Sequence, residues 1–419
     1  MTKSFLSSVL TVAGGTAVAQ AISLVSLPFI TRLYPPEIYG AFVVFLAYGG
    51  FVTPIVCARF DVAIALPKRN RGAAAVALGS LVVAAGVALM TALLLLVLSA
   101  WVPFLGDAAA WCLPLYIWLG GALLVFSSWS ARMRTYSRLS WSRIAQAAAT
   151  AGLAICLVAA TDARAALLVI ATVAGQVVGL AVLIGAPPEA RLGWRARPHQ
   201  VVRLLRHFRR LAAFNVPHVL SDAAQGSGLP LLVAAFFGTQ ATAYYAFSVR
   251  LLKAPLGLVS GAVSQVYYPR AAAHRDDNRR LRHDALRILA VSTPAALLLL
   301  PLLLLTPERV FAAAFGPAWR DVGSYLHALA PWILSSFVAA PLSVLYLVKE
   351  QFALDFYLGL AGSVIAFSIL CVARLMSGEV MFAMWALSLG MTVYVVASTV
   401  AEFRYVIGRG GRGLPAERP

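Results

Sequence analysis

The chain has 419 residues, of which 61% are hydrophobic and 12% are charged, with a mean hydropathy of +0.83. Soluble globular proteins are about half apolar and about a quarter charged, so this composition excludes a soluble enzyme, a secreted disulfide scaffold and a disordered protein. The net charge of +18 fits a helical membrane protein that keeps Lys and Arg on its cytoplasmic side, and it does not require a nucleic-acid partner.

Twelve apolar runs are long enough to cross a bilayer as helices, because about 20 residues span the hydrocarbon core. They cover approximately residues 8–31, 38–58, 73–101, 108–128, 145–161, 165–185, 211–236, 241–266, 286–305, 322–348, 353–373 and 381–403. The loops alternate in charge, with 27 Lys and Arg on one side of the membrane and five on the other. This bias predicts that both termini are cytoplasmic.

A basic stretch at residues 186–210 divides the chain into six spans (1–185) and six spans (211–419). The two parts share short matches, since Leu27-Pro28 precedes a Tyr-x-Ala-Phe segment at Tyr39 and Leu229-Pro230 precedes another at Tyr244. We therefore predict two six-helix bundles that form a parallel repeat, with the substrate site between them. The segment 200–210 is either an amphipathic helix on the inner leaflet or a solvated basic loop.

The seventh span carries four polar residues at spacings of three, four and three, namely Asn215, His218, Asp222 and Gln225. This spacing places them on one helix face. Polar groups at bilayer depth are costly and indicate a functional site, for example one that binds sugar hydroxyls or a proton or Na⁺ at Asp222. The alternative is a buried network that only joins helices.

The eighth span carries Arg250 and Lys253, which share a helix face. Two cations on one face suit an anion, and the planar guanidinium binds phosphate oxygens well. The alternative is that both side chains snorkel to a nearby membrane surface. Arg250 lies about nine residues, or about 13 Å, into the predicted span, which argues against easy snorkelling.

Several classes of site find no support in the sequence. The four cysteines are scattered singly, without metal or disulfide spacing, and no nucleotide-binding or protease motif is present. The predicted external loops are short, the longest being residues 306–321, which disfavours a polymerase or ligase with an external catalytic loop. We therefore predict a protein that is not an enzyme and needs no cofactor, with H⁺ or Na⁺ coupling left open.

Three segments resemble Wzx-type polysaccharide flippases. The first is residues 15–40, which contain Leu27-Pro28-Phe29-Ile30 and Tyr39-Gly40. The second is residues 58–68, with the sequence Ala-Arg-Phe-Asp-Val-Ala-Ile-Ala-Leu-Pro-Lys. The third is residues 244–270, where Arg250 precedes Pro255 by five residues. The resemblance implies the MATE-like fold of the MOP superfamily. It also implies roles for Arg32, Arg59, Asp61 and Arg250, although spacing alone makes Arg32, Arg59 and Asp61 interface anchors.

The resemblance further implies a substrate, an undecaprenyl-pyrophosphate-linked oligosaccharide moved from the inner to the outer leaflet of the bacterial plasma membrane for O-antigen, capsule or exopolysaccharide assembly. Implied partners are membrane lipids, a polysaccharide polymerase and a chain-length regulator. Unlike lipid II flippases, the chain has no arginine within the first span before Arg32. The rival hypotheses are a MATE-like drug or cation antiporter, a membrane enzyme of polysaccharide assembly, and a scaffold without transport.

Overall fold

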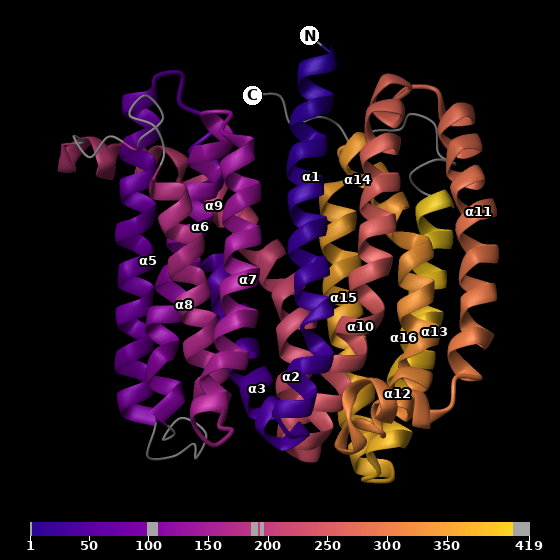
Figure 1. Cartoon of the computed structure of the whole chain (residues 1–419). Helices are drawn as coiled ribbons and strands as arrows, with labels where there is room; N and C mark the ends of the chain where they lie inside the picture. The colour runs from indigo at the N-terminus through magenta and orange to yellow at the C-terminus, as the bar shows by residue number, and fades with distance from the viewer. Residues whose placement is uncertain (1, 99–107, 186–191, 193–196, 405–419) are drawn as a thin grey trace. The chain divides into compact units, whose positions relative to one another are not determined.

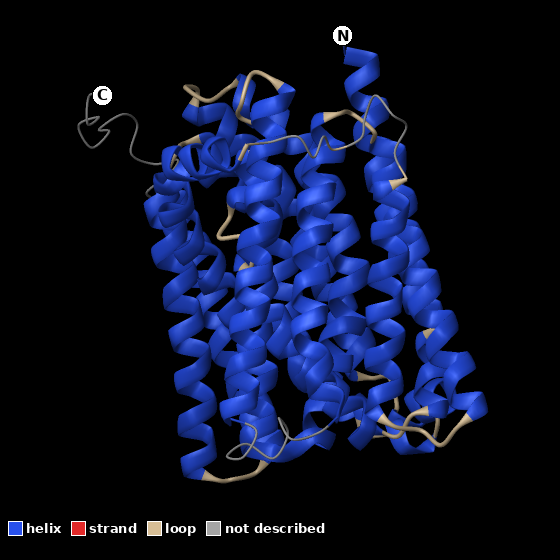
Figure 2. Ribbon diagram, turned by 90° about the vertical axis from the view of Figure 1, so that its left-hand side faces the viewer, coloured by secondary structure: helices blue, strands red, loops and turns tan. Residues whose placement is uncertain are grey.

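The computed structural model describes residues 2–98, 108–185, 192 and 197–404. These residues are helical and contain no strand (Figures 1 and 2). The C-terminal tail and most of the predicted linker between residues 186 and 196 lie outside the described residues. Statements about these segments therefore stay predictions.

The helices follow in two groups by sequence. The first group is α1 (Thr2–Val25), α2 (Leu27–Leu33), α3 (Pro36–Val52), η1 (Thr53–Ile55), α4 (Phe60–Ala63), α5 (Asn70–Leu98), η3 (Ala108–Cys112), α6 (Leu113–Arg132), α7 (Tyr136–Ala160), α8 (Ala165–Ile184), α9 (Pro198–Ala223) and η5 (Ala224–Gly228). The second group is α10 (Leu229–Ala273), α11 (Asn278–Leu304), α12 (Glu308–Phe315), η6 (Pro317–Trp319), α13 (Val322–Ala339), η7 (Ala340–Ser343), α14 (Val344–Val348), α15 (Phe352–Met376) and α16 (Val380–Glu402).

Eleven helical segments of the described chain are long and apolar enough to cross a membrane, so the protein is an all-helical, multi-pass membrane protein. One of these segments, Asn215–Ala273, has 59 residues and covers both the seventh and the eighth predicted spans. It is interrupted at Gly238, which has φ 84° and ψ 177°. A continuous helix of this length would extend about 88 Å, far more than a bilayer of about 30 Å.

The chain packs as two compact units, and each is described by itself. Unit 1 comprises residues 1–243 together with Ala312–Trp319, and unit 2 comprises Tyr244–Phe311 together with residues 320–419. The seventh predicted span packs within unit 1. The reason is that α9 and η5 pack on α3, α4 and α5. The repeat boundary at residues 186–210 stays a prediction.

Small residues bring the helices of unit 1 close together, as is usual in a lipid environment where packing drives helix association. A Cβ atom added to Gly50 of α3 would lie 2.7 Å from Ser227 Oγ of η5, and one added to Gly40 would overlap the Thr239 carbonyl oxygen. Gly49 faces the Tyr116 ring of α6 in the same way. These contacts show that α3 packs closely on its neighbours at Gly49 and Gly50, and they fix the path of the seventh span along α3.

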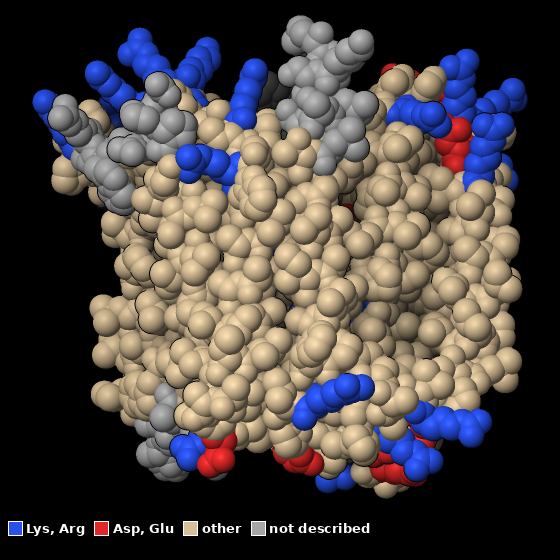
Figure 3. Space-filling model, viewed as in Figure 1, with Lys and Arg blue, Asp and Glu red and all other residues tan. Residues whose placement is uncertain are grey.

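Charged side chains gather near the helix ends in each unit. On the face shown in Figure 3, Lys and Arg side chains flank a band of uncharged residues. Such a band is what the hydrocarbon core requires, because charged groups at bilayer depth are costly. The few charged residues within the spans therefore define the candidate site.

Candidate functional site

A break in unit 1 after η1 positions Arg59 and Asp61. Ala58 and Arg59 both have positive φ, at 45° and 61°, and a left-handed residue other than glycine costs about 1–2 kcal/mol. After this turn α4 begins, and the Arg59 Nη1 and Asp61 Oδ2 atoms are 3.9 Å apart. The side chains are 22% and 5% exposed. The structure thus brings together two residues that the sequence assigned only by family resemblance.

The pair is ionic but incompletely hydrogen-bonded, since Asp61 Oδ1 and Arg59 Nε are buried without a hydrogen-bond partner. Burial raises the pKa of the Asp61 carboxyl, while Arg59 and the backbone amides of Asp61 and Val62 act to lower it. The net upward shift makes Asp61 a candidate proton-binding group. Neighbouring Cys57 is fully buried, and burial raises the pKa of its thiol to about 12, so it stays a protonated packing residue.

Arg132 of α6 holds the chain just beyond this pair, a role that its place in a basic loop did not reveal. Its guanidinium donates hydrogen bonds to the carbonyl oxygens of Ile64, Ala65 and Pro67, at 3.1, 3.1 and 2.7 Å. These carbonyls follow the short helix α4 and have few partners of their own. Arg132 therefore positions the segment that carries Asp61.

The polar residues of the seventh span lie on α9 and η5 in unit 1. Asn215, His218 and Asp222 occupy regular α-helix and share one face, whereas Gln225 lies in the π-helical turn η5. Asp222 is exposed and the other three are half-buried. The predicted single face of four is thus correct for the first three residues, and the wider turn sets Gln225 apart from it.

The π turn occurs where the local sequence weakens the α-helix. Pro217 lies inside α9, and Gly226 and Gly228 lie in the turn itself. Single π turns are rare and are frequent at functional sites. The Asn215 side-chain amide donates to the Leu211 carbonyl of its own helix at 2.9 Å, so part of its hydrogen-bonding capacity is already used. The exposed Asp222 carboxylate is the strongest candidate of the four for contact with a ligand or ion.

Arg250 and Lys253 lie on α10 in unit 2, and both are exposed. The helical stretch after Gly238 begins at Thr239, so Arg250 is eleven residues, or about 16 Å, along it. This depth favours a water-filled setting over snorkelling. Lys253 Nζ lies 5.3 Å from the ring centroid of Trp332, a buried residue of α13. That cation–π contact gives Lys253 a structural role, so Arg250 is the better candidate for an anionic ligand.

Arg32 lies at the end of α2 and donates a hydrogen bond to the Ala313 carbonyl at 2.9 Å. Beside it, Trp319 Nε1 donates to the Thr31 carbonyl at 2.8 Å, and the indole is fully buried. Arg32 and Trp319 both line a recess of about 420 Å³. The helical segments α3 and η1 lie between Arg32 and the Arg59 turn. Together they have 20 residues and are about 30 Å long, so the structure does not bring these two arginines together. Arg32 is thus held at its own end of unit 1 by its hydrogen bond to Ala313.

Comparisons with known proteins place the chain in a structural family. Three solved structures that it resembles are an inward-facing multidrug resistance MATE family transporter of the MOP superfamily (12% identity, 94% of each chain covered, TM-score 0.66), the lipid II flippase MurJ in an inward closed conformation (14%, 93% of this chain and 87% of that one, TM-score 0.65) and a MOP superfamily transporter from Pyrococcus furiosus (12%, 95% and 94%, TM-score 0.63). At these identities the likeness concerns the fold alone. No curated protein sequence matches the chain.

The sequence model of one family matches residues 29–324, which is most of the chain and includes Arg32, Arg59, Asp61 and Arg250. The description of that family is "polysaccharide biosynthesis protein". Of the three segments that resemble Wzx-type flippases, residues 58–68 and 244–270 lie wholly within the matched region, and residues 15–40 lie partly within it. The fold resembles that of solved MOP superfamily transporters. The chain belongs to this family of polysaccharide biosynthesis proteins, and its fold is MATE-like.

Proposed function

We propose that the protein translocates an undecaprenyl-pyrophosphate-linked oligosaccharide from the inner to the outer leaflet of the bacterial plasma membrane, for O-antigen, capsule or exopolysaccharide assembly. The observation that carries this proposal is Arg250, a fixed cation exposed about 16 Å along a membrane-spanning helix. A cation at bilayer depth is costly, and such residues mark functional sites in membrane proteins. Binding of an anionic substrate explains the presence of Arg250 at this position, whereas helix packing does not require a cation there.

Arg250 binds the pyrophosphate in this proposal, because its planar guanidinium donates two parallel hydrogen bonds to phosphate oxygens. Lys253 adds positive charge one turn away while it stays against Trp332. Arg59 and Arg32 are carried over from the family resemblance as further substrate contacts, although Arg32 is also held by Ala313. Asn215, His218 and Gln225 offer hydrogen-bonding groups for sugar hydroxyls. The polar head group thus exchanges water for protein, while its lipid tail remains in the bilayer.

The membrane potential supplies part of the driving force in this mechanism. An anion that moves outward follows an inside-negative potential, at about 2.3 kcal/mol per charge per 100 mV. We infer twelve spans, with Gly238 dividing the 59-residue segment, and both termini in the cytoplasm because of the Lys and Arg bias. Asp222 and Asp61 are the proposed sites for H⁺ or Na⁺ coupling. A polymerase and a chain-length regulator are the proposed protein partners.

A deletion of the gene in its host tests the proposal. We expect lipid-linked repeat units to accumulate on the cytoplasmic face and surface glycan to be lost, with both restored by the wild-type gene. Arg250→Gln should restore glycan poorly and Arg250→Lys partly, because lysine keeps the charge but not the bidentate geometry. Arg374→Gln, a change at an exposed arginine near the end of α15, is the matched control and should restore glycan fully.

The same strains separate the alternatives. Normal surface glycan with reduced efflux of ethidium would indicate a drug or cation antiporter, for which the exposed carboxylate of Asp222 is the favourable feature. Lost polymer without accumulation of single repeat units on the cytoplasmic face would indicate a polymerase or ligase. Equal complementation by Arg250→Gln and wild type, at matched protein levels, would contradict the assignment of Arg250.

A further inference from the structure

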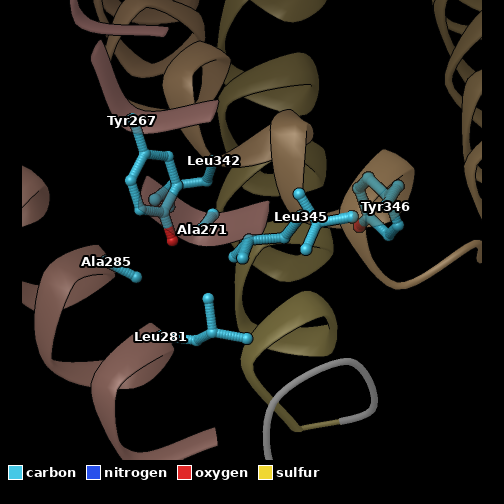
Figure 4. Packing of buried hydrophobic residues seen from close by; sticks show 8 residues of the cluster. Tyr267, Ala271, Leu281, Ala285, Leu342, Leu345 and Tyr346 are labelled. Atoms are coloured by element: carbon cyan, nitrogen blue, oxygen red, sulfur yellow. The ribbon is translucent and has the colours of Figure 1, made fainter. Parts of the chain in front are cut away.

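One end of unit 2 contains an apolar cluster built from four segments. It comprises Tyr267 and Ala271 of α10, Leu281 and Ala285 of α11, Leu342 of η7, and Leu345, Tyr346 and Val348 of α14. Figure 4 shows these side chains converging, with the Tyr267 hydroxyl pointing into the cluster. Phe403 packs against the same cluster. The residue before it, Glu402, ends α16.

Glu402 is a buried acid with no cation to balance it. It is 4% exposed, and its Oε1 atom is buried without a hydrogen-bond partner. Within the described chain it forms no ion pair. A second buried oxygen nearby is in the same condition, since Tyr267 is also 4% exposed and its hydroxyl has no partner. Two unpartnered oxygens in one apolar cluster are exceptional, because nearly all buried polar groups are hydrogen-bonded.

The titratable groups that surround Glu402 are acids and phenols. It interacts electrostatically with Asp355 of α15, Tyr346 of α14 and Tyr267 of α10. Asp284 of α11 also acts electrostatically on Tyr267, and the Tyr394 hydroxyl of α16 donates a hydrogen bond to the Leu358 carbonyl.

The nearby bases are used elsewhere or lie in solvent. The ammonium of Lys349 donates to the Arg275 carbonyl and to Asn278 Oδ1, each at 2.6 Å. Arg404 is exposed and forms no ion pair among the described residues. An ionised Glu402 would therefore add a negative charge beside Asp355 with no counter-charge, whereas the neutral acid adds none.

We propose that Glu402 is a proton-binding site of unit 2, neutral in the packing seen here, and distinct from Asp61 and Asp222. The bound proton removes the charge that the apolar cluster cannot solvate. A metal ion fits less well, since the described residues contain no group of three or more His, Cys, Asp or Glu able to hold one. Release of the proton requires this end of unit 2 to open to water, so protonation of Glu402 and packing of the neighbouring Phe403 against the apolar cluster are linked.

Infrared difference spectroscopy of the full-length protein in lipid nanodiscs tests this site without any substrate. At neutral pH we expect the carbonyl band of one protonated carboxylic acid that Glu402→Gln removes. Glu350→Gln is the matched control, because Glu350 lies near the same end of unit 2 but is 60% exposed and paired with Arg275 at 2.9 Å. That change should leave the band intact. Asp61→Asn should leave it intact as well, which separates the two buried acids.

A second variant keeps the test decisive if Glu402→Gln does not fold. Tyr267→Phe removes the neighbouring phenol and should shift the frequency of the Glu402 band without deleting it. Spectra in which neither substitution alters an acid band would overturn the proposal. Loss of the band on addition of Na⁺ would also overturn it, in favour of a cation site. The readout does not involve transport, so its failure leaves the proposed flippase function untouched.

Discussion

Asp61 in unit 1 and Glu402 in unit 2 are both carboxyl residues with 4% of their surface exposed, yet their surroundings differ. Asp61 has a guanidinium 3.9 Å away and two backbone amides that favour its charged form. Glu402 has an acid and two phenols. Burial favours the neutral form of both acids. The groups that the fold brings beside them differ, because those around Asp61 oppose the effect of burial and those around Glu402 do not.

The largest effect on this comparison is expected when Asp61 is deprived of its partner. Arg59→Gln leaves Asp61 buried beside no cation, and we expect the free energy of unfolding to fall by about 1–3 kcal/mol, since removal of one member of a buried pair is strongly destabilising and Arg59 is only partly buried. Thermal unfolding in detergent measures the change. The double variant Arg59→Gln/Asp61→Asn should recover most of the loss, and a double variant as unstable as the single one would refute the pairing.

A smaller effect is expected from pH. Burial raises the pKa of folded Asp61 above its ordinary value of 3.8, so the folded protein holds this proton more tightly than the unfolded chain. The resulting stabilisation is complete below the unfolded pKa and is lost as pH rises through the folded pKa. We expect a slope of at most about 1.4 kcal/mol per pH unit from this group. Asp61→Asn should flatten stability across that window, and an unchanged slope would show that Asp61 does not titrate there.

The smallest effect is expected at an exposed acid that has a clear partner. Glu350 and Arg275 form an ion pair at 2.9 Å, with side chains 60% and 52% exposed. Because solvent screens such pairs, Glu350→Gln should change the free energy of unfolding by less than about 1 kcal/mol. Chemical unfolding at low and high salt measures this. A loss of stability as large as that of Arg59→Gln would show that the exposure of an ion pair does not predict how much the pair contributes to stability in this protein.

The sequence predicted the spans well, because long apolar runs are the strongest local signal that a membrane protein carries. The structure adds details that the apolar pattern does not carry. The first predicted span corresponds to one membrane-crossing segment, Thr11–Leu33, which is divided at Ser26 into α1 and α2, with Pro28 near the start of α2. The seventh span begins within a helix that starts at Pro198, before the predicted boundary at residue 211. Residues 200–210 are helical, as the amphipathic-helix interpretation of that segment requires. The position of this helix on the inner leaflet stays a prediction.

The site was predictable to the extent that its residues are close in sequence. Arg59 and Asp61 are two residues apart, and Asn215, His218 and Asp222 share a face because their spacing is helical. Glu402 was missed because its environment comes from α10, α14 and α15, which lie between 26 and 173 residues earlier in the chain. A single acid at the end of the last span has no local feature that distinguishes it from a solvated loop residue.

The most direct test of the central claim is reconstitution of the purified protein in vesicles that contain an undecaprenyl-pyrophosphate-linked oligosaccharide. An impermeant glycosidase then reports how fast inner-leaflet head groups reach the outer leaflet. We predict faster exposure than in protein-free vesicles, slowed at least about tenfold by Arg250→Gln, which corresponds to the loss of about 1.4 kcal/mol of binding, and unchanged by Arg374→Gln. Exposure at the protein-free rate would contradict the proposed function, and equal rates for wild type and Arg250→Gln would contradict the role of Arg250.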